Sequence, residues 1–177
     1  MESQLERILG ADYLGRLEER PIEELRSMRS QCQDIESGLS YLRRLVQGRL
    51  DIVAVQREAR RAGSEPGDLT SLIERLPEIL SDRTRSNGPG RPPQPLAPGE
   101  IDPALENEFA EVVAGHDVES LPELDDYGLA DLHDRLEDLE RRVSARRRDL
   151  FDRIDALQAE ITRRYRIGDA SVETLLQ

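Results

Sequence analysis

The chain has 177 residues, of which 37% are hydrophobic, 3% aromatic and 35% charged, and its formal net charge at pH 7 is -12. This composition argues against a large globular core. It favours long helices that bury a narrow row of apolar side chains and expose most of their surface. The negative charge disfavours a general nucleic-acid binder, because phosphate contacts dominate that kind of affinity. The expected partner is therefore a protein or a small molecule, with no direct DNA binding.

The sequence also indicates where in the cell the protein is expected. No apolar run approaches the length of a membrane span, so no membrane association is predicted. A single cysteine and no recognisable signal peptide indicate a reducing compartment, and we expect the protein to be cytoplasmic.

The N-terminal part of the chain predicts a short helical segment and then a long helix. Residues 1–20 contain spaced apolar side chains interrupted by glycines, which suits one or two short helices that are too small to be stable alone. Pro21 suits the first position of a helix, and acidic residues follow it in the first turn, where they complement the helix dipole. We predict the first coiled-coil helix at 21–62, ending before Gly63.

A connector and a second long helix follow. The connector, 63–125, contains the apolar spacing of a short helix at about 69–80 and a stretch rich in proline and glycine at 84–103 that reads as an extended linker. After it, we predict the second coiled-coil helix at 126–166 and a C-terminal tail at 167–177.

Each long helix carries an apolar seam in which steps of three and four residues alternate, as at heptad positions a and d. On the first helix the seam is Leu25, Met28, Cys32, Ile35, Leu39, Leu42 and Val46, and on the second it is Leu129, Leu132, Leu136, Leu139, Val143 and, after Arg146, Leu150. A single chain that folds back through a connector pairs its helices antiparallel. The predicted fold is all-α, a long antiparallel two-helix coiled coil with short accessory helices.

A polar stripe runs beside each seam and is repeated within the chain. Its residues follow one another at steps of four, three, four and four, which places them on one helical face. The first copy is Glu36, Ser40, Arg43, Gln47 and Asp51, and the second copy is Glu140, Ser144, Arg147, Phe151 and Asp155. In an antiparallel pair the two stripes share one surface, and we expect Arg43 beside Arg147 and Glu36 near Asp155.

The residue types of this stripe suit guanine. Arginine can donate to guanine O6 and N7 or stack on the base, and a carboxylate can accept from the N1 and N2 donors. The alternative remains open, because positions beside a coiled-coil seam are routinely polar. An apolar shoulder lies opposite the stripe on the first helix, at Tyr41, Leu45, Ile52 and Val55, and needs a cover from this chain or from a partner.

No catalytic constellation is evident. His116 falls in a predicted loop and His133 on the second helix, neither with the spacing of a metal site, and Cys32 belongs to the seam. We find no phosphate-binding loop or nucleophile motif. The sequence therefore predicts neither an enzyme nor a metal protein.

The repeated pattern E-x3-S-x2-R-x3-Q-x3-D resembles the signature of the RsiG family of cyclic-di-GMP-binding anti-sigma factors from filamentous actinobacteria. It is complete from Glu36 to Asp51, and from Glu140 to Asp155 it departs only at Phe151. The resemblance implies an antiparallel coiled coil that binds a stacked pair of cyclic-di-GMP molecules and, when loaded, sequesters WhiG, a sporulation sigma factor of the flagellar type.

Carried over residue by residue, the resemblance implies that Arg43, Arg147, Asp51 and Asp155 contact guanines. It implies that the site is completed by Glu36, Glu140, Ser40, Ser144 and Gln47. Phe151 cannot supply the amide of a glutamine but can stack on a base. The sequence thus favours a cyclic-di-GMP-responsive anti-sigma factor that represses transcription; the rival interpretation is a ligand-independent coiled-coil adaptor.

Overall fold

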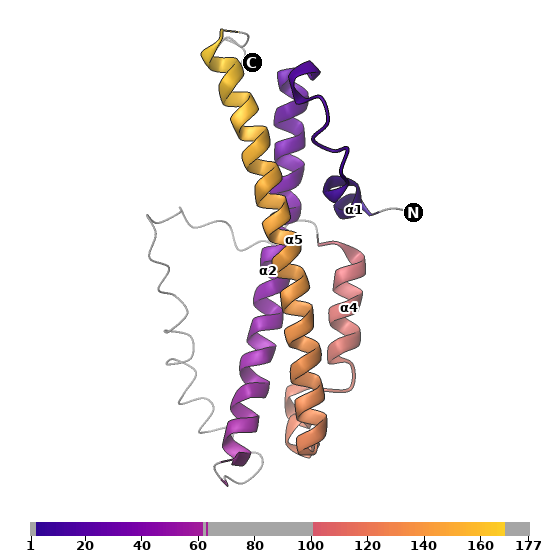
Figure 1. The fold of residues 1–177 in the computed structure, drawn as a ribbon. Coiled ribbons are helices and arrows are strands. Elements are labelled where there is room, and N and C mark those ends of the chain that lie inside the picture. The colour runs from indigo at the N-terminus through magenta and orange to yellow at the C-terminus, as the bar shows by residue number, and fades with distance from the viewer. Residues whose placement is uncertain (1–2, 62, 64–100, 169–177) are drawn as a thin grey trace. The chain divides into compact units, whose positions relative to one another are not determined.

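The computed structural model describes residues 3–61, 63 and 101–168, and all regular structure in these ranges is helical (Figure 1). The elements are α1 (Gln4–Leu9), the 3-10 helix η1 (Leu17–Glu19), α2 (Ile22–Arg61), α4 (Pro103–Val113), the 3-10 helix η2 (Val118–Glu123) and α5 (Asp126–Arg166). The helix predicted at about 69–80, most of the 84–103 linker and the end of the tail lie outside the described residues. Among the helices described, none is long and apolar enough to cross a membrane.

The chain divides into two compact units, each containing part of both long helices. Unit 1 comprises Met1–Arg43, Pro98–Glu106 and Arg142–Gln177, and unit 2 comprises Arg44–Ala97 and Asn107–Arg141. Within unit 1, Arg26 on α2 contacts Tyr165 on α5, while Arg43 contacts Ser144. From the first of these contacts to the second, the residue number increases along α2 and decreases along α5. The two helices therefore pack antiparallel in this unit.

The same orientation holds inside unit 2. There Gln47 on α2 hydrogen-bonds Glu140 on α5, and Arg60 pairs with Asp126. The predicted fold class is therefore confirmed: an all-helical protein whose two long helices pack antiparallel, with shorter helices besides. The first long helix spans Ile22–Arg61, and residue 62, where we predicted its end, lies outside the described residues; the second spans Asp126–Arg166.

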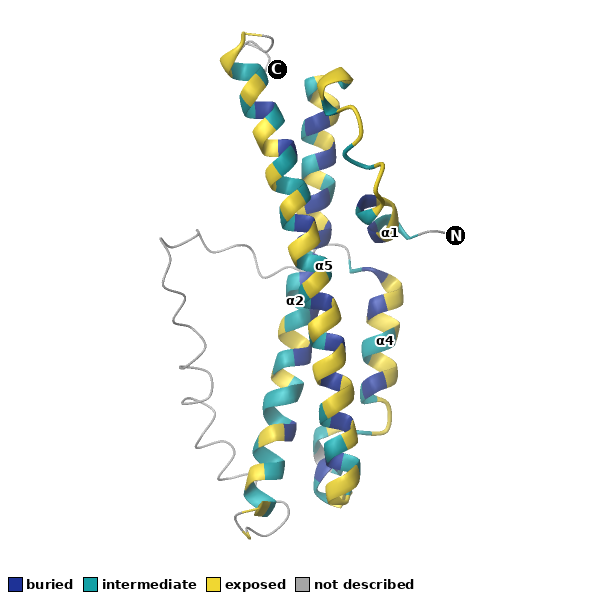
Figure 2. Cartoon of the chain, viewed as in Figure 1, coloured by how far each residue is buried: buried dark blue, intermediate teal, exposed yellow. Residues whose placement is uncertain are grey.

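The seam residues form the core of each unit (Figure 2). Every residue that we assigned to the two seams is buried, and the pattern continues through Val53 on α2 and Leu157 and Ile161 on α5. Burial of one such aliphatic side chain stabilises the fold by roughly 1.5–3 kcal/mol. Cys32 is fully buried, and this burial raises the pKa of its thiol, so it is a packing residue as predicted.

The N-terminal segment of unit 1 is held in place by arginines. Helix α1 begins with a capping box between Ser3 and Glu6, but its six residues are too few to be stable alone. At its other end, Arg153 of α5 donates to the carbonyl oxygens of Ile8 at 2.7 Å and Leu9 at 2.6 Å. These are terminal carbonyls that the helix itself cannot pair.

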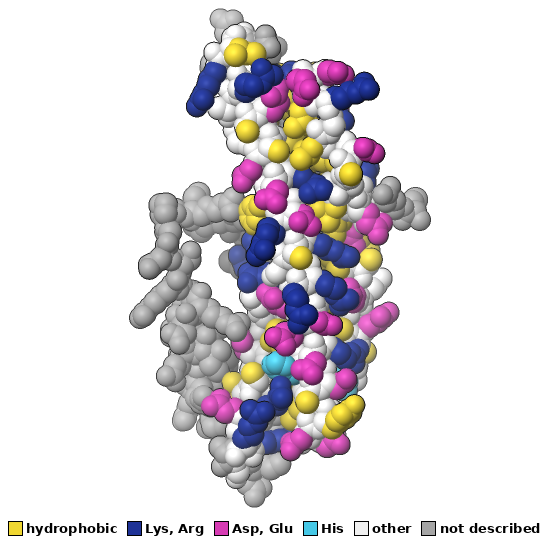
Figure 3. Space-filling model, viewed as in Figure 1, with side chains coloured by type: hydrophobic (Ala, Val, Ile, Leu, Met, Phe, Trp, Pro, Cys, Tyr) yellow, Lys and Arg dark blue, Asp and Glu magenta, His cyan; other side chains and the backbone are white. Residues whose placement is uncertain are grey.

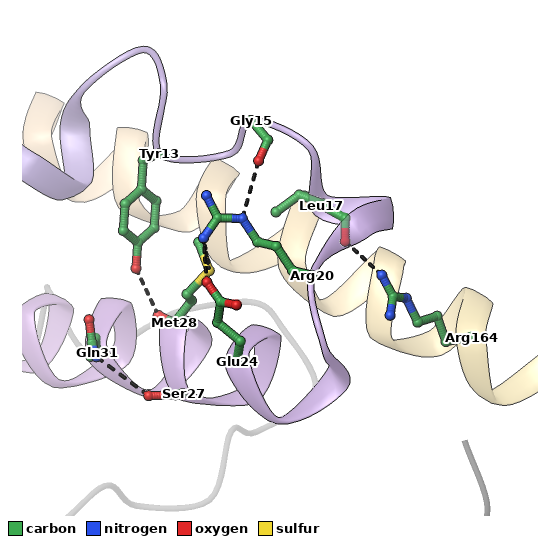
Figure 4. A network of polar contacts seen from close by, with 9 residues as sticks. All are labelled: Tyr13, Gly15, Leu17, Arg20, Glu24, Ser27, Met28, Gln31 and Arg164. Carbon is green, nitrogen blue, oxygen red and sulfur yellow. Dashed lines mark hydrogen bonds and ion pairs between the residues drawn. The ribbon is translucent and has the colours of Figure 1, made fainter. Parts of the chain in front are cut away.

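The rest of that segment is attached in the same way (Figure 4). Arg164 of α5 donates to the carbonyl oxygen of Leu17 at 2.7 Å, and Arg20 donates to that of Gly15 at 3.2 Å. The hydroxyl of Tyr13 donates to the carbonyl oxygen of Met28 on α2 at 3.3 Å. Burial raises the pKa of Tyr13, so this hydroxyl stays protonated and remains a donor.

Unit 2 uses arginine for the same purpose. Arg60 of α2 donates to the carbonyl oxygens of Leu121 at 3.3 Å and Pro122 at 2.8 Å, which attaches η2. Arg135 of α5 donates to the carbonyl oxygen of Glu111 on α4 at 3.4 Å. In both units, therefore, a long helix binds the backbone of a short segment through guanidinium groups.

The attachment through Arg164 also involves the carboxylate of Glu160. Glu160 accepts from Arg163 at 2.7 Å and from Arg164 at 2.9 Å, and Arg164 also binds Leu17. Hydrogen bonds from Arg163 first, and then from Arg164, lower the pKa of Glu160 from 4.5 to about 2. Glu160 thus orients the guanidinium that holds η1.

We predict that Glu160 stabilises the fold in a pH-dependent way. A carboxyl whose pKa is lower in the folded state contributes stability above its unfolded pKa and loses it as the pH falls toward the folded pKa. The difference in unfolding free energy between the wild type and Glu160→Gln should be largest near pH 6 and shrink between pH 4.5 and about pH 2. Urea titrations over this range measure it. Glu18→Gln, at an exposed carboxylate, is the control, and a pH-independent difference for Glu160→Gln would contradict the prediction.

Candidate ligand-binding stripe

The ten stripe residues, which we call the signature residues, all lie on α2 and α5 but divide between the two units. Unit 1 contains Glu36, Ser40, Arg43, Ser144, Arg147, Phe151 and Asp155. Unit 2 contains Gln47, Asp51 and Glu140. Glu36 is buried, Asp155 is exposed, and the others are half-buried, as expected for positions beside a seam.

In unit 1 the signature residues of the two helices contact one another. The Nε of Arg147 donates to the Oε1 of Glu36 at 3.0 Å, and the Oγ of Ser40 donates to the same oxygen at 2.6 Å. The Nε of Arg43 donates to the Oγ of Ser144 at 2.9 Å. The expectation that the two stripes share one surface is therefore correct within this unit.

The contact of Glu36 is one that we did not predict. We predicted Glu36 near Asp155, a like-charge neighbour, but the partner of Glu36 is the cation Arg147. Arg147 lies eight residues before Asp155, a displacement of about 12 Å along α5. Glu36 thus has a cation as its direct partner, in an ion pair in which the carboxylate side chain is only 6% exposed and that of Arg147 is 23% exposed.

Phe151 also contacts Arg147. The guanidinium carbon of Arg147 lies 5.2 Å from the centroid of the Phe151 ring, within the range of a cation–π interaction. In unit 2, where the other copy of the pattern places Gln47, the amide Nε2 of Gln47 donates to the Oε1 of Glu140 at 3.1 Å. The two equivalent positions therefore make different contacts: an aromatic ring on an arginine, and an amide on a glutamate.

A comparison with protein families identifies the family of this chain. The model of a family described as RsiG-like matches residues 11–80 and 115–177, which include both copies of the signature. The chain belongs to the RsiG-like family. Membership implies an anti-sigma role rather than catalysis, with a sigma factor as partner, in a family that binds cyclic-di-GMP. A search among curated proteins gave no match to this chain.

One further cluster of polar groups lies on α5 of this RsiG-like chain. The sequence shows no metal-ligand spacing at His133, but in the structure His133, Asp134 and Glu137 bring ligand atoms within 4.8 Å of one another. Two of these three residues are exposed, and such surface groups are common without an ion. We assign no metal to them.

The apolar shoulder of the RsiG-like chain is partly open. Leu45 is 39% exposed, and Tyr41, Ile52 and Val55 are half-buried. The segment at about 69–80 that we considered as a cover lies outside the described residues. On the face shown in Figure 3, cationic and anionic side chains of the described residues interleave, with small hydrophobic patches between them.

We predict that the Glu36–Arg147 pair stabilises the free protein measurably. Hydrogen bonds to charged groups contribute more when the groups are shielded from water, so Glu36→Gln and Arg147→Gln, made singly and together, should show a coupling energy of about 1 kcal/mol or more. Urea denaturation of the four proteins gives this value. The exposed pair Asp138 and Arg141 is the matched control, for which we expect less than about 0.5 kcal/mol. Additive effects at Glu36 and Arg147 would contradict the prediction.

Proposed function

We propose that this RsiG-like protein is an anti-sigma factor that responds to cyclic-di-GMP. The signature residues of α2 and α5 bind a stacked pair of cyclic-di-GMP molecules, and the loaded protein sequesters a sigma factor of the flagellar and sporulation type. Transcription that depends on this sigma factor is thereby repressed. The observation that supports the proposal best is the direct contact between signature residues of the two helices in unit 1.

The donors and acceptors that the signature residues carry match the edges of guanine. Arg43 and Arg147 donate to O6 and N7, as arginine does in major-groove recognition. Asp51 and Asp155 accept from the N1 and N2 donors, and the remaining signature residues complete the site. These roles come from the resemblance and from the donors and acceptors that each side chain carries.

The ion pair between Glu36 and Arg147 is compatible with ligand entry. Separation of a shielded pair is costly when either charge is left without a partner. Guanine offers acceptors to an arginine and donors to a carboxylate, so the bases of the stacked pair can replace the contact that each group loses. Adenine presents no equivalent pair of N1 and N2 donors, and this difference supplies a basis for discrimination.

A ligand-independent adaptor is the second candidate function. The half-open apolar shoulder around Leu45 favours it, because such a surface can bind a partner protein without any nucleotide. Equilibrium dialysis separates the two candidates: the proposed function requires cyclic-di-GMP to bind more tightly than GTP and cyclic-di-AMP. Indifference to all three nucleotides would favour the adaptor.

We predict that Arg43→Ala weakens cyclic-di-GMP binding without unfolding the protein. Arg43 lies off the seam, and loss of a bidentate guanine contact costs about 1–3 kcal/mol, or roughly five- to 150-fold in affinity. Arg49→Ala removes the same charge from a position of α2 outside the signature and is the control. Dialysis measures affinity, and thermal melting checks the fold. Unchanged affinity with a normal melt would rule out Arg43 as a ligand contact.

A further prediction concerns the partner. If the loaded protein binds the sigma factor better than the empty one, the sigma factor must raise the affinity for cyclic-di-GMP by the same factor, because coupling between two ligands is reciprocal. Coupling of 1–3 kcal/mol corresponds to about five- to 150-fold. Titration of cyclic-di-GMP with and without saturating sigma factor tests this, and equal affinities would show that the nucleotide is not the switch.

A further inference from the structure

The second copy of the signature has Phe151 where the first copy has Gln47. The contacts of Phe151 suggest a role that Gln47 does not have. The phenyl ring has no hydrogen-bond donor, so it cannot give Glu36 the bond that the Gln47 amide gives to Glu140. Instead, the ring lies against Arg147, whose Nε is bound to Glu36. Phe151 therefore acts on the arginine of its own copy and not on a carboxylate.

We propose that Phe151 is a positioning residue that holds Arg147 on Glu36 and so makes the two signature copies bind cyclic-di-GMP unequally. This inference rests on the proposed function. The copy that contains Gln47 takes the tighter ligand, and the copy that contains Phe151 takes the weaker one.

Two effects weaken the Phe151 copy, and both act in the same direction. First, the copy offers no amide to the ligand, whereas Gln47, once it leaves Glu140, offers both a donor and an acceptor. Second, Arg147 must leave the ring face before it can turn to a guanine, which opposes binding by the strength of a cation–π contact. A neutral hydrogen bond and a half-buried cation–π contact together correspond to roughly a tenfold difference in affinity.

The burial of the group supports this reading. Glu36 is the one buried carboxylate among the signature residues, and Phe151 and Arg147 are half-buried. The ring thus covers a guanidinium that already neutralises a shielded charge. A ligand that binds Arg147 must therefore displace both of its contacts, the Glu36 carboxylate and the Phe151 ring.

The test is calorimetric titration of cyclic-di-GMP into the full chain and three variants, fitted to two binding steps. Phe151→Gln restores the amide and removes the ring, so the weaker step should tighten about tenfold. Phe151→Leu removes only the aromatic face and should tighten that step about threefold, which reflects the released Arg147. Tyr165→Leu is the matched control, because Tyr165 also stacks with an arginine, Arg26, in unit 1 but lies outside the signature; both steps should be unchanged.

The outcomes separate the inference from the proposed function. Weaker binding after Phe151→Leu would mean that the ring stacks on the ligand, and an unchanged second step after Phe151→Gln would mean that the two copies are equivalent; either result overturns the inference alone. An absence of cyclic-di-GMP binding in the wild type would overturn the proposed function.

A measurement on the free protein tests the positioning role without any ligand. The Nε–H proton of Arg147 should exchange slowly with water in the wild type, because it is bound to Glu36 next to the ring, and should exchange several-fold faster in Phe151→Leu. Nuclear magnetic resonance of the arginine side chains reports this rate. Equal exchange rates in the two proteins would show that Phe151 does not hold Arg147.

Discussion

The narrow seam between α2 and α5 is the constraint on which the rest of each unit depends. A pair of helices buries only a row of aliphatic side chains, so residues one step beside the row are neither inside nor fully in water. Charged groups placed there must find partners, because a shielded charge without one is costly. Glu36 shows the consequence: it is buried, and it is held by Ser40 and by Arg147 from the facing helix.

The same half-buried positions explain how the short segments are attached. The six-residue α1 and the 3-10 helices have too few internal hydrogen bonds to persist alone. Arginines on the long helices, such as Arg153 in unit 1 and Arg60 in unit 2, bind their backbone oxygens through several donors of one planar fork. The long helices thus supply both the core and the anchors.

Much of the architecture follows from periodicity. The heptad steps predicted two long helices and which of their side chains are buried, because spacing along a helix determines the face that a residue occupies. The internal repeat also pointed to the family to which the chain belongs. Periodicity does not determine which residue lies opposite which, because that register depends on packing between the helices. The contact of Glu36 with Arg147 could therefore not be predicted. The arginine anchors could not be predicted either, because any peptide carbonyl can accept their bonds and leaves no pattern in the sequence.

The choice of acceptor has an evolutionary consequence. Arg153 and Arg164 bind main-chain oxygens of Ile8, Leu9 and Leu17, and every residue type carries such an oxygen. Substitutions in the N-terminal segment leave these attachments intact as long as the backbone keeps its path, whereas loss of either arginine removes them outright. We therefore expect many substitutions to be tolerated in the N-terminal segment, but few at Arg153 and Arg164 of α5. The residues that keep the segment in place would then be conserved on another helix and not in the segment itself.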